Sequence, residues 1–314
     1  MNSNENSIHC PLCGKLAHGV KLWVKNDVGD ILRCMKCGLG FFDPLKLHEL
    51  ADLNPTLYNS KSYYKLLIRT HSDLISRYRT QVKEIYKMVG KKGKLLDVGC
   101  SIGMFLNIAS SYGFETYGFD INKINLNKAK QFFGIKPLPD NYLNDNDFVN
   151  FFDIVTMWDV LEHLPNPVEY LSHLIMVLKP GGLLVVQCPN MESYEFSKFG
   201  KNWNWLTPGD HLQFFTPKTL TKVLSAGGFH IIKVKPWMDG LSFSKYMIKL
   251  KNRNPTFLFN RLLFKMIKKL NGFFQKVNLN VPIEKVQGIY GWLLQSIHHA
   301  RRRHSLIKIF AVRP

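Results

Sequence analysis

The sequence of 314 residues has no long apolar run and no recognisable secretion signal. No stretch of about 18 uncharged apolar residues occurs, so we expect no membrane-spanning helix. Residues 1–7 lack the basic segment followed by an apolar one that marks a secreted protein. We therefore expect a cytoplasmic protein whose thiols stay reduced.

Acidic residues are scarce, above all in the last part of the chain. Asp and Glu number 23 against 42 Lys and Arg, which gives a formal net charge of +19. Residues 241–314 hold 15 of the basic residues and one acidic residue, Glu284, whereas the first 240 residues have a net charge of only +5. Any anionic partner is therefore expected to meet residues 241–314.

Cysteine is also uncommon, but its spacing is informative. Four of the six cysteines form two Cys-x-x-Cys pairs 20 residues apart, Cys10 with Cys13 and Cys34 with Cys37. Four thiolates at this spacing are typical of a closed structural Zn²⁺ site, and a glycine follows each pair, as knuckle turns prefer. The pattern predicts a zinc ribbon over residues 1–45 that folds around its metal. Chelation is then expected to unfold this module only.

A dinucleotide fingerprint, Gly-x-Gly-x-x-Gly, is absent, yet a nucleotide-binding pattern is present. Residues 94–103 read as a buried strand, a tight turn with Gly99 and Gly103, and a helix start. A second strand ends at Asp120, whose carboxylate can accept hydrogen bonds from both hydroxyls of a ribose. Several nucleotide cofactors remain compatible with this pattern alone.

The order of motifs resembles that of the class I S-adenosylmethionine-dependent methyltransferases. Asp97, Gly99 and Gly103 match motif I of that family, and Ser101 stands where its middle glycine is usual. Three later segments resemble motif IV, the fifth strand with its preceding turn, and the last helix with the sixth strand: 152–163, 178–187 and 211–229. Sequence segments of this kind are typical of methyltransferases that belong to glycan and polyketide pathways.

The resemblance implies an α/β, Rossmann-like fold of seven strands, with an antiparallel last strand over residues 305–312. We expect the methyltransferase core at 93–240 and 305–314, a helical linker or cap at 46–92 and a basic amphipathic helical insertion at 241–304. The resemblance also implies S-adenosylmethionine as the cofactor. Its expected contacts are Asp97, Gly99, Cys100, Ser101, Gly103, Asp120, Ile121, Trp158 and Asp159.

The acceptor site is less well defined by the sequence. A hydroxyl acceptor must lose its proton, and His163 and His211 are the candidate bases. Glu162 with His163 is also a candidate pair for a divalent ion, as in some ubiquinone-pathway relatives. Aromatic residues are the candidate substrate contacts, with packing as the alternative role: Tyr63, Trp203 and Trp205.

The expected activity is methyl transfer to a hydroxyl or carbon of a glycan, nucleotide-sugar or lipid-linked saccharide. Methylation of RNA, bound by the ribbon and the basic insertion, is the alternative. A ribbon scaffold with an inactive domain is a third hypothesis. Three roles stay open for the insertion: contact with the inner face of a membrane, a lid, or a dimer contact. The oligomeric state also stays open.

Overall fold

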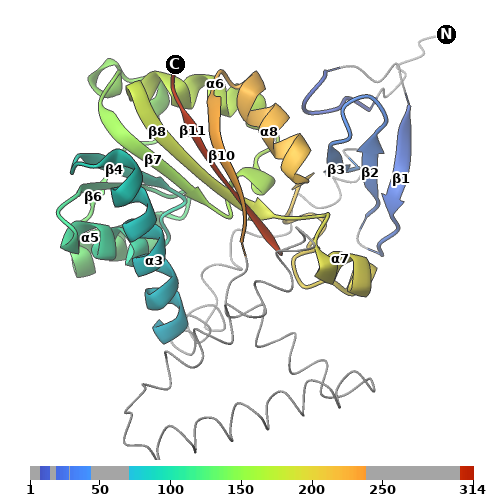
Figure 1. Ribbon diagram of the computed structural model, residues 1–314, viewed down its shortest axis with the longest axis horizontal. Helices are drawn as coiled ribbons and strands as arrows, with labels where there is room; N and C mark the ends of the chain where they lie inside the picture. Colours follow the sequence, from blue (N-terminus) through green and yellow to red (C-terminus); the bar gives the residue numbers. More distant parts are fainter. Residues whose placement is uncertain (1–7, 15–18, 28, 44–70, 238–304) are drawn as a thin grey trace, which may run out of the picture.

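A seven-stranded sheet forms the centre of the molecule in the computed structural model, which describes residues 8–14, 19–27, 29–43, 71–237 and 305–314 (Figure 1). From edge to edge the strands are β10 (His230–Trp237), β11 (Leu306–Val312), β8 (Leu178–Pro189), β7 (Phe152–Trp158), β4 (Lys94–Val98), β5 (Glu115–Phe119) and β6 (Lys136–Pro137). Strand β11 runs antiparallel to both of its neighbours, and the other pairs are parallel. The predicted Rossmann-like fold with an antiparallel last strand is confirmed.

Helices cover both faces of this sheet, because successive side chains of a strand point to opposite faces. In β8, Leu184 and Val186 belong to one apolar core, and Leu183 and Val185 belong to the other. The first core is covered by α6 (Pro167–Val177) and α8 (Pro217–Ala226). The second is covered by α3 (His71–Val89), α4 (Met104–Ser111) and α5 (Lys123–Phe133). The strands are therefore buried on both sides, as their nearly continuous apolar sequence requires.

Local sequence explains where these helices begin and end. The side chain of Asn122 accepts hydrogen bonds from two amides of the first turn of α5, and Gly134 ends that helix in the left-handed conformation. Thr216 and Thr219 form a reciprocal capping box at the start of α8, with Pro217 in its first turn. The observed bounds consequently lie within one residue of the predicted helices 122–132 and 217–226.

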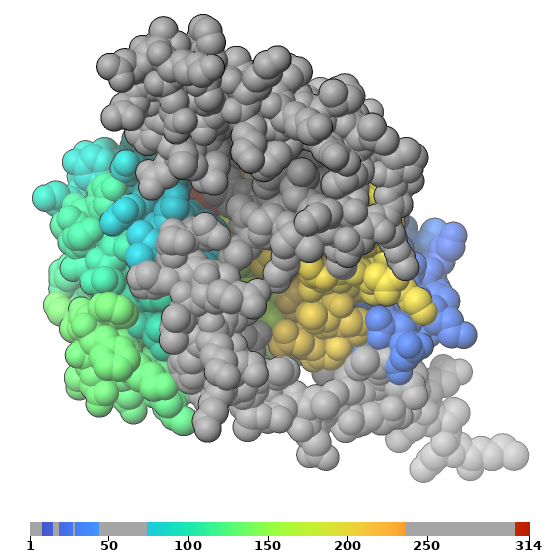
Figure 2. All heavy atoms as spheres, turned by 90° about the horizontal axis from the view of Figure 1, so that it is seen from below, coloured from blue at the N-terminus to red at the C-terminus, as the bar shows by residue number. Residues whose placement is uncertain are grey.

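A second, four-stranded sheet joins the N-terminal residues to the core. Strands β1 (Val20–Val24), β2 (Ile31–Cys34) and β3 (Gly40–Phe42) are antiparallel, and β9 (Gln213–Phe214) extends the sheet beyond β3. Figure 2 shows these N-terminal residues, in blue, packed against the yellow segment that contains α7 (Tyr194–Phe199). Strands β3 and β9 are too short to show an alternating pattern, so the sequence did not predict their pairing.

Two predicted elements lie wholly or partly outside the described residues. The long helix predicted over residues 63–89 is described from His71, so Tyr63 is not covered, and neither is the insertion at 241–304. Within the part of the chain that the structure describes, no helix combines the length and the apolar character needed to cross a bilayer.

Candidate active site

The turn after β4 has a backbone conformation that its glycines permit. Gly99 and Gly103 have φ angles of +74° and +81°, in the left-handed region that favours glycine. A Cβ atom on Gly99 would lie 2.4 Å from Cγ2 of Val160. Ser101, between the two glycines, also has a positive φ of 50°. The two glycines are therefore required by the backbone conformation of the turn and by its close packing against neighbouring side chains.

Asp120 ties this turn to the end of β5. One carboxylate oxygen accepts the N–H of Ser101 at 2.7 Å, and the other accepts the N–H of Asn122 at 2.8 Å. Burial raises the pKa of Asp120, and the two amide donors oppose that shift. Each oxygen keeps a second lone pair for a ribose hydroxyl. Ile121 beside it is 88% exposed and offers an apolar surface for a flat base.

Asp97 lies beneath the same turn and is buried. Its Oδ1 accepts a hydrogen bond from Oγ1 of Thr156 at 2.6 Å. Burial, and then the nearby charge of Asp120, raise the pKa of Asp97 well above its usual range. Cys100 is also buried, and a Cβ atom placed on Gly118 would lie only 2.8 Å from the Sγ of Cys100. A cationic group of a ligand at this position would offset the cost of the buried carboxylates.

Asp159, at the end of β7, begins a chain of hydrogen bonds through two amide side chains from distant segments. Nε2 of Gln187 donates to both carboxylate oxygens of Asp159, at 3.1 and 3.2 Å, and Nε2 of Gln81 donates to Oε1 of Gln187 at 3.2 Å. The sequence did not reveal this network, because α3 and β8 meet only in the folded chain. The indole N–H of Trp158 is buried and has no acceptor among the described residues.

The predicted cofactor residues thus gather at one edge of the sheet, at the carboxyl ends of β4, β5 and β7. Open sheets of this kind bind ligands at that edge. The glycine turn, the acceptor capacity of Asp120, the apolar Ile121 and the indole N–H of Trp158 fit S-adenosylmethionine. The individual contacts stay predictions.

Glu162, His163 and His211 form a separate polar cluster just beyond β7. Glu162 and His163 lie on a single 3₁₀ turn (Leu161–His163), and His211 comes from the segment that leads into β9. Their side-chain ligand atoms all lie within 4.8 Å of one another, and the two imidazole centroids are 4.7 Å apart. Both candidate bases and the predicted ion ligand Glu162 are therefore brought together.

Hydrogen bonding orients His163 within this cluster. Its Nδ1 donates to the backbone carbonyl of Asp210 at 2.7 Å and lies 3.4 Å from Oδ1 of the same residue. This bond leaves Nε2 as the atom that can accept a proton or bind a metal. The side chain of Glu162 is fully buried, and the weak donor beside its carboxyl group is the thiol of Cys188.

Burial and neighbouring charges shift the pKa values of Glu162, His163 and His211 in different directions. Burial raises the pKa of Glu162 to about 8. Burial opposes protonation of His163, but the hydrogen bond to Asp210 and the charge of Glu162 outweigh it and raise the His163 pKa to about 9. Burial and the charge of His163 lower the pKa of His211 to about 3. At neutral pH His211 is therefore neutral and His163 is the cation.

The predicted substrate tryptophans lie near this cluster but are not on an open loop. Trp203 is 4% exposed and packs on Phe196, with ring centroids 5.6 Å apart. Its apolar cluster also contains Ile31 and Phe42 of the ribbon, with Trp205 partly buried at the margin. Their role in substrate binding stays a prediction, and the burial of Trp203 favours a packing role. Tyr63 lies outside the described residues.

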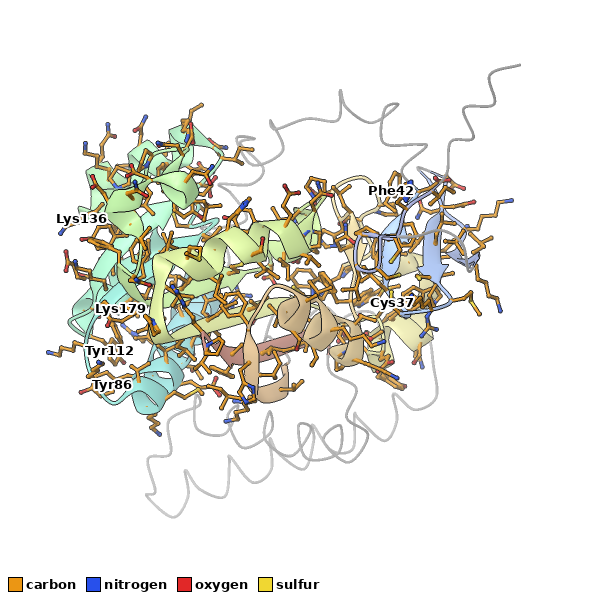
Figure 3. The ribbon with its side chains drawn as sticks, turned by 90° about the horizontal axis from the view of Figure 1, so that it is seen from above. Cys37, Phe42, Tyr86, Tyr112, Lys136 and Lys179 are labelled. Carbon is orange, nitrogen blue, oxygen red and sulfur yellow. The ribbon has the colours of Figure 1, made fainter. Side chains whose placement is uncertain are left out.

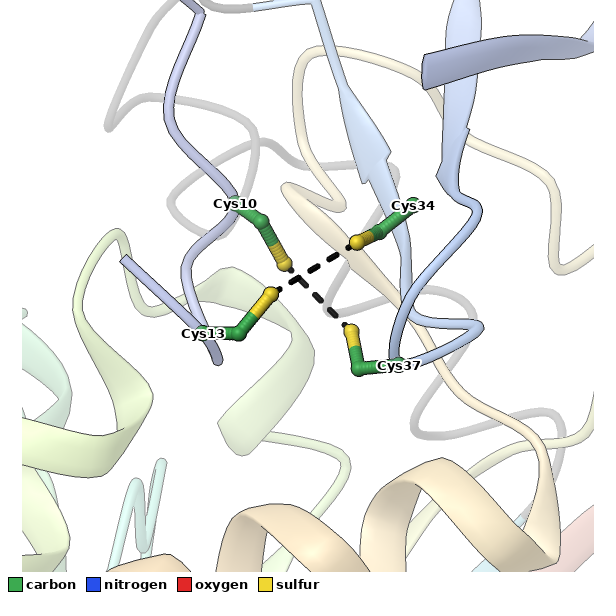
Figure 4. Close-up of side chains that lie close together, drawn as sticks. All are labelled: Cys10, Cys13, Cys34 and Cys37. Carbon is green, nitrogen blue, oxygen red and sulfur yellow. Dashed lines mark hydrogen bonds between the residues drawn. The ribbon is translucent and has the colours of Figure 1, made fainter. Parts of the chain in front are cut away.

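The four cysteines of the predicted ribbon converge on one point (Figure 4). The Sγ atoms of Cys10 and Cys37 are 3.5 Å apart, those of Cys13 and Cys34 are 3.6 Å apart, and all four are free thiols. Tetrahedral Zn²⁺ with bonds of about 2.3 Å separates its sulfur ligands by about 3.8 Å. A hydrogen bond from the Cys10 thiol lowers the pKa of Cys37 to about 5. The cluster fits a four-thiolate zinc site.

Comparison with known proteins gives the family. A family model described as a methyltransferase domain matches residues 70–234, which are 165 of the 314 residues. Ubiquinone biosynthesis O-methyltransferase of Coxiella burnetii is 28% identical over 204 residues, covering 61% of this chain and 84% of its own. The protein of the same name from Rickettsia typhi is 23% identical over 219 residues, covering 66% and 87%.

Solved structures show weaker similarity. A SAM-dependent methyltransferase from Archaeoglobus fulgidus has a TM-score of 0.49 at 18% identity, covering 80% of this chain and 99% of that chain. Phosphoethanolamine N-methyltransferase 2 of Haemonchus contortus, solved with S-adenosyl-L-methionine, has a TM-score of 0.43 at 18% identity, covering 75% and 52%. The sequence match to the family model is therefore decisive: the chain belongs to the methyltransferase domain family and is an S-adenosylmethionine-dependent methyltransferase.

Proposed function

We propose that this enzyme methylates a hydroxyl group of a small molecule. The observation that carries the proposal is the buried cluster of Glu162, His163 and His211 beyond β7. S-adenosylmethionine supplies a methyl group on an already activated sulfonium. The protein therefore has two tasks, which are to orient the acceptor and to remove its proton.

The cofactor-binding tasks are distributed over the edge of the sheet. Asp120 accepts the ribose hydroxyls while its amide contacts keep the turn in place. Ile121 would offer its exposed apolar side chain to the adenine, and Asp97 would offer its carboxylate to the cationic amino group. Asp159, held by Gln187, is a further proposed cofactor contact.

The cluster provides the proton acceptor. His211 is neutral at neutral pH and needs no prior deprotonation, but its pKa of about 3 makes it a weak proton acceptor. His163, with a pKa of about 9, is the stronger base once it has lost the proton from Nε2. The same three side chains also offer one carboxylate and two imidazoles to a divalent ion, which would acidify a bound hydroxyl. The convergence of the three ligand atoms within 4.8 Å of one another supports this second form of the mechanism, in which the ion would displace the proton of Glu162.

The names of the curated relatives support a hydroxyl acceptor, since both are O-methyltransferases of ubiquinone biosynthesis. The motif segments between residues 152 and 229 resemble those of glycan-pathway methyltransferases, which supports a hydroxyl or carbon of a saccharide as the acceptor. We infer that the acceptor is a low-molecular-weight hydroxyl compound or a saccharide, with RNA as the competing substrate that the excess of basic residues suggests.

We also propose that Cys10, Cys13, Cys34 and Cys37 hold a structural Zn²⁺. The convergence of the four thiols, at sulfur–sulfur distances close to those of a tetrahedral site, supports this. A closed set of four thiolates leaves no open coordination position, so the metal stabilises the fold and takes no part in methyl transfer.

The test is transfer of labelled methyl from S-adenosylmethionine to three acceptor pools: a lipid-extractable fraction, saccharides and total RNA. His211→Ala should lower label in the accepted pool by about 10²-fold or more, and His173→Ala, a change of an exposed histidine on α6, should not. Glu162→Gln should lower it similarly if the carboxylate binds an ion. Addition of Mg²⁺ or of a chelator of divalent ions separates the two forms of the mechanism. Label that appears only in RNA, and disappears with ribonuclease, would overturn the small-molecule proposal.

A further inference from the structure

A short path of backbone hydrogen bonds joins the ribbon to the cluster of Glu162, His163 and His211. The N–H of Phe42 donates to the carbonyl of Leu212 at 2.9 Å, next to the pairing of β3 with β9. The N–H of Leu212 donates in turn to the carbonyl of Glu162 at 2.8 Å. Leu212 is thus held from both sides, and His211 directly precedes it in the chain.

Side-chain packing leaves β9 little freedom to move away from β3. A Cβ on Gly40 would lie 2.3 Å from the ring of Trp23 and 3.0 Å from Cβ of Phe214, so the two strands are in close contact. Gln213 is buried, and its Nε2 donates to the carbonyl of Leu164 at 3.2 Å. The segment that carries His211 is therefore hydrogen-bonded to the ribbon on one side and to the turn that carries His163 on the other.

The four thiols lie at the start of this path. Cys34 ends β2, and β3 begins three residues after Cys37. The carbonyl of Cys37 also accepts a hydrogen bond from Nζ of Lys222 on α8, at 3.0 Å. Figure 3 places Cys37 and Phe42 together at the ribbon end of the molecule, with Lys136 of β6 at the opposite end. A metal that fixes Cys34 and Cys37 thereby fixes the register of β3.

We infer that the metal centre of the ribbon positions His211, so that loss of the metal impairs methyl transfer without impairing cofactor binding. The inference rests on the zinc site and on the cluster chemistry proposed above. The cofactor turn is on β4 and β5, and the ribbon pairs only with β9 among the described strands. A positioning role for the metal predicts separate responses at the two sites.

The experiment compares Cys37→Ser with Met35→Ser in the full-length enzyme. Met35 lies in the same knuckle and is 61% exposed, so its change should preserve the metal. Three quantities are measured: zinc per chain, the Kd for S-adenosylmethionine, and hydrogen–deuterium exchange of the peptide covering residues 208–216. We expect Cys37→Ser to lose zinc, to exchange this peptide about tenfold faster or more, and to keep its Kd within about threefold. Met35→Ser should match the wild type in all three.

A second variant separates the metal from the pairing. Gly40→Val keeps all four thiols but forces a clash with Trp23 and Phe214. This variant should retain zinc, and its Kd for S-adenosylmethionine should not change. Hydrogen–deuterium exchange of residues 208–216 should be faster, and methyl transfer should be lost. The inference would be overturned if an enzyme without zinc exchanged residues 208–216 at the wild-type rate. It would also be overturned if cofactor binding were lost together with zinc. Wild-type enzyme that contains no zinc would instead remove the proposed metal site.

Discussion

The carboxyl edge of β4, β5 and β7 and the cluster of Glu162, His163 and His211 differ in how their carboxylates are satisfied. Asp97, Asp120 and Asp159 each accept at least one hydrogen bond from an N–H or O–H group of the protein. The fully buried carboxyl group of Glu162 has instead the thiol of Cys188 and the imidazole of His163 beside it. A thiol is a weak donor, so burial dominates at Glu162. The first region is built to hold a shape, and the second is built to take up a proton or an ion.

The same contrast is visible in charge. Two amide donors oppose the effect of burial at Asp120, whereas desolvation dominates at Glu162 and moves its pKa to about 8. Perturbed groups of this kind concentrate at functional sites, because acid–base chemistry needs a pKa near the working pH. Four predictions test whether the two regions have separate tasks.

The largest effect is expected at Asp120. Replacement by Ala removes the proposed ribose acceptor and also releases the amides of Ser101 and Asn122, so affinity for S-adenosylmethionine should fall by about 100-fold or more. Isothermal titration calorimetry measures the change, and circular dichroism checks the fold. An unchanged affinity in the folded variant would mean that the ribose lies elsewhere.

Changes in the cluster should affect the reaction and not the cofactor. His211→Ala is expected to lower kcat by about 10²- to 10⁴-fold, the usual contribution of a positioned base, with little change in the Kd for S-adenosylmethionine. Glu162→Gln should behave similarly if the carboxylate binds an ion. His173→Ala is the matched control, and equal rates for it and His211→Ala would remove His211 from the chemistry.

The pH dependence should reveal the protonation of His163. Its pKa is raised to about 9 in the folded protein, against about 6.5 when unfolded, so the charged form stabilises the fold. That stabilisation is complete below about pH 6.5 and is lost as the pH rises through about 9. Thermal unfolding of the wild type and of His163→Gln at pH 6 and pH 9.5 measures it: the gap in Tm should shrink at the higher pH. A gap that does not depend on pH would show that folding leaves the pKa of His163 unshifted.

The smallest effect is expected at Ser101. Its φ of 50° is a conformation that glycine adopts without strain, and the N–H that donates to Asp120 belongs to the backbone, which glycine retains. Ser101→Gly should therefore keep the affinity for S-adenosylmethionine within about threefold of the wild type. A large loss of affinity would show that the hydroxyl of Ser101 contacts the cofactor.

Local sequence predicted most of the fold, because each helix and long strand of the core carries its own signal. The strand bounds 152–158 and the helix bounds 217–226 agree with β7 and α8. Strand β8 is longer than the predicted 182–188, since its first residues, 178–181, include a Pro-Gly turn sequence that argues against a strand. The short α7 was not predicted, because one and a half turns show too little periodicity.

The site was predictable only in part, for a related reason. Motif I and Asp120 lie within a continuous segment, so their chemistry can be predicted from spacing. Gln81 lies in no motif, and Gln187 and Leu212 lie in motif segments without a predicted role, yet they hold Asp159 and connect the ribbon to Glu162. Nothing in the local sequence indicates these contacts.

The sequence by itself determined the methyltransferase fold, the cofactor edge and the four cysteines, since each of these depends on residues close together in the chain. The tertiary structure alone decided that His163 and His211 lie in contact, that Glu162 is buried beside them, and that β9 extends the ribbon sheet. These features depend on segments about fifty or more residues apart, which meet only when burial of apolar surface brings them together.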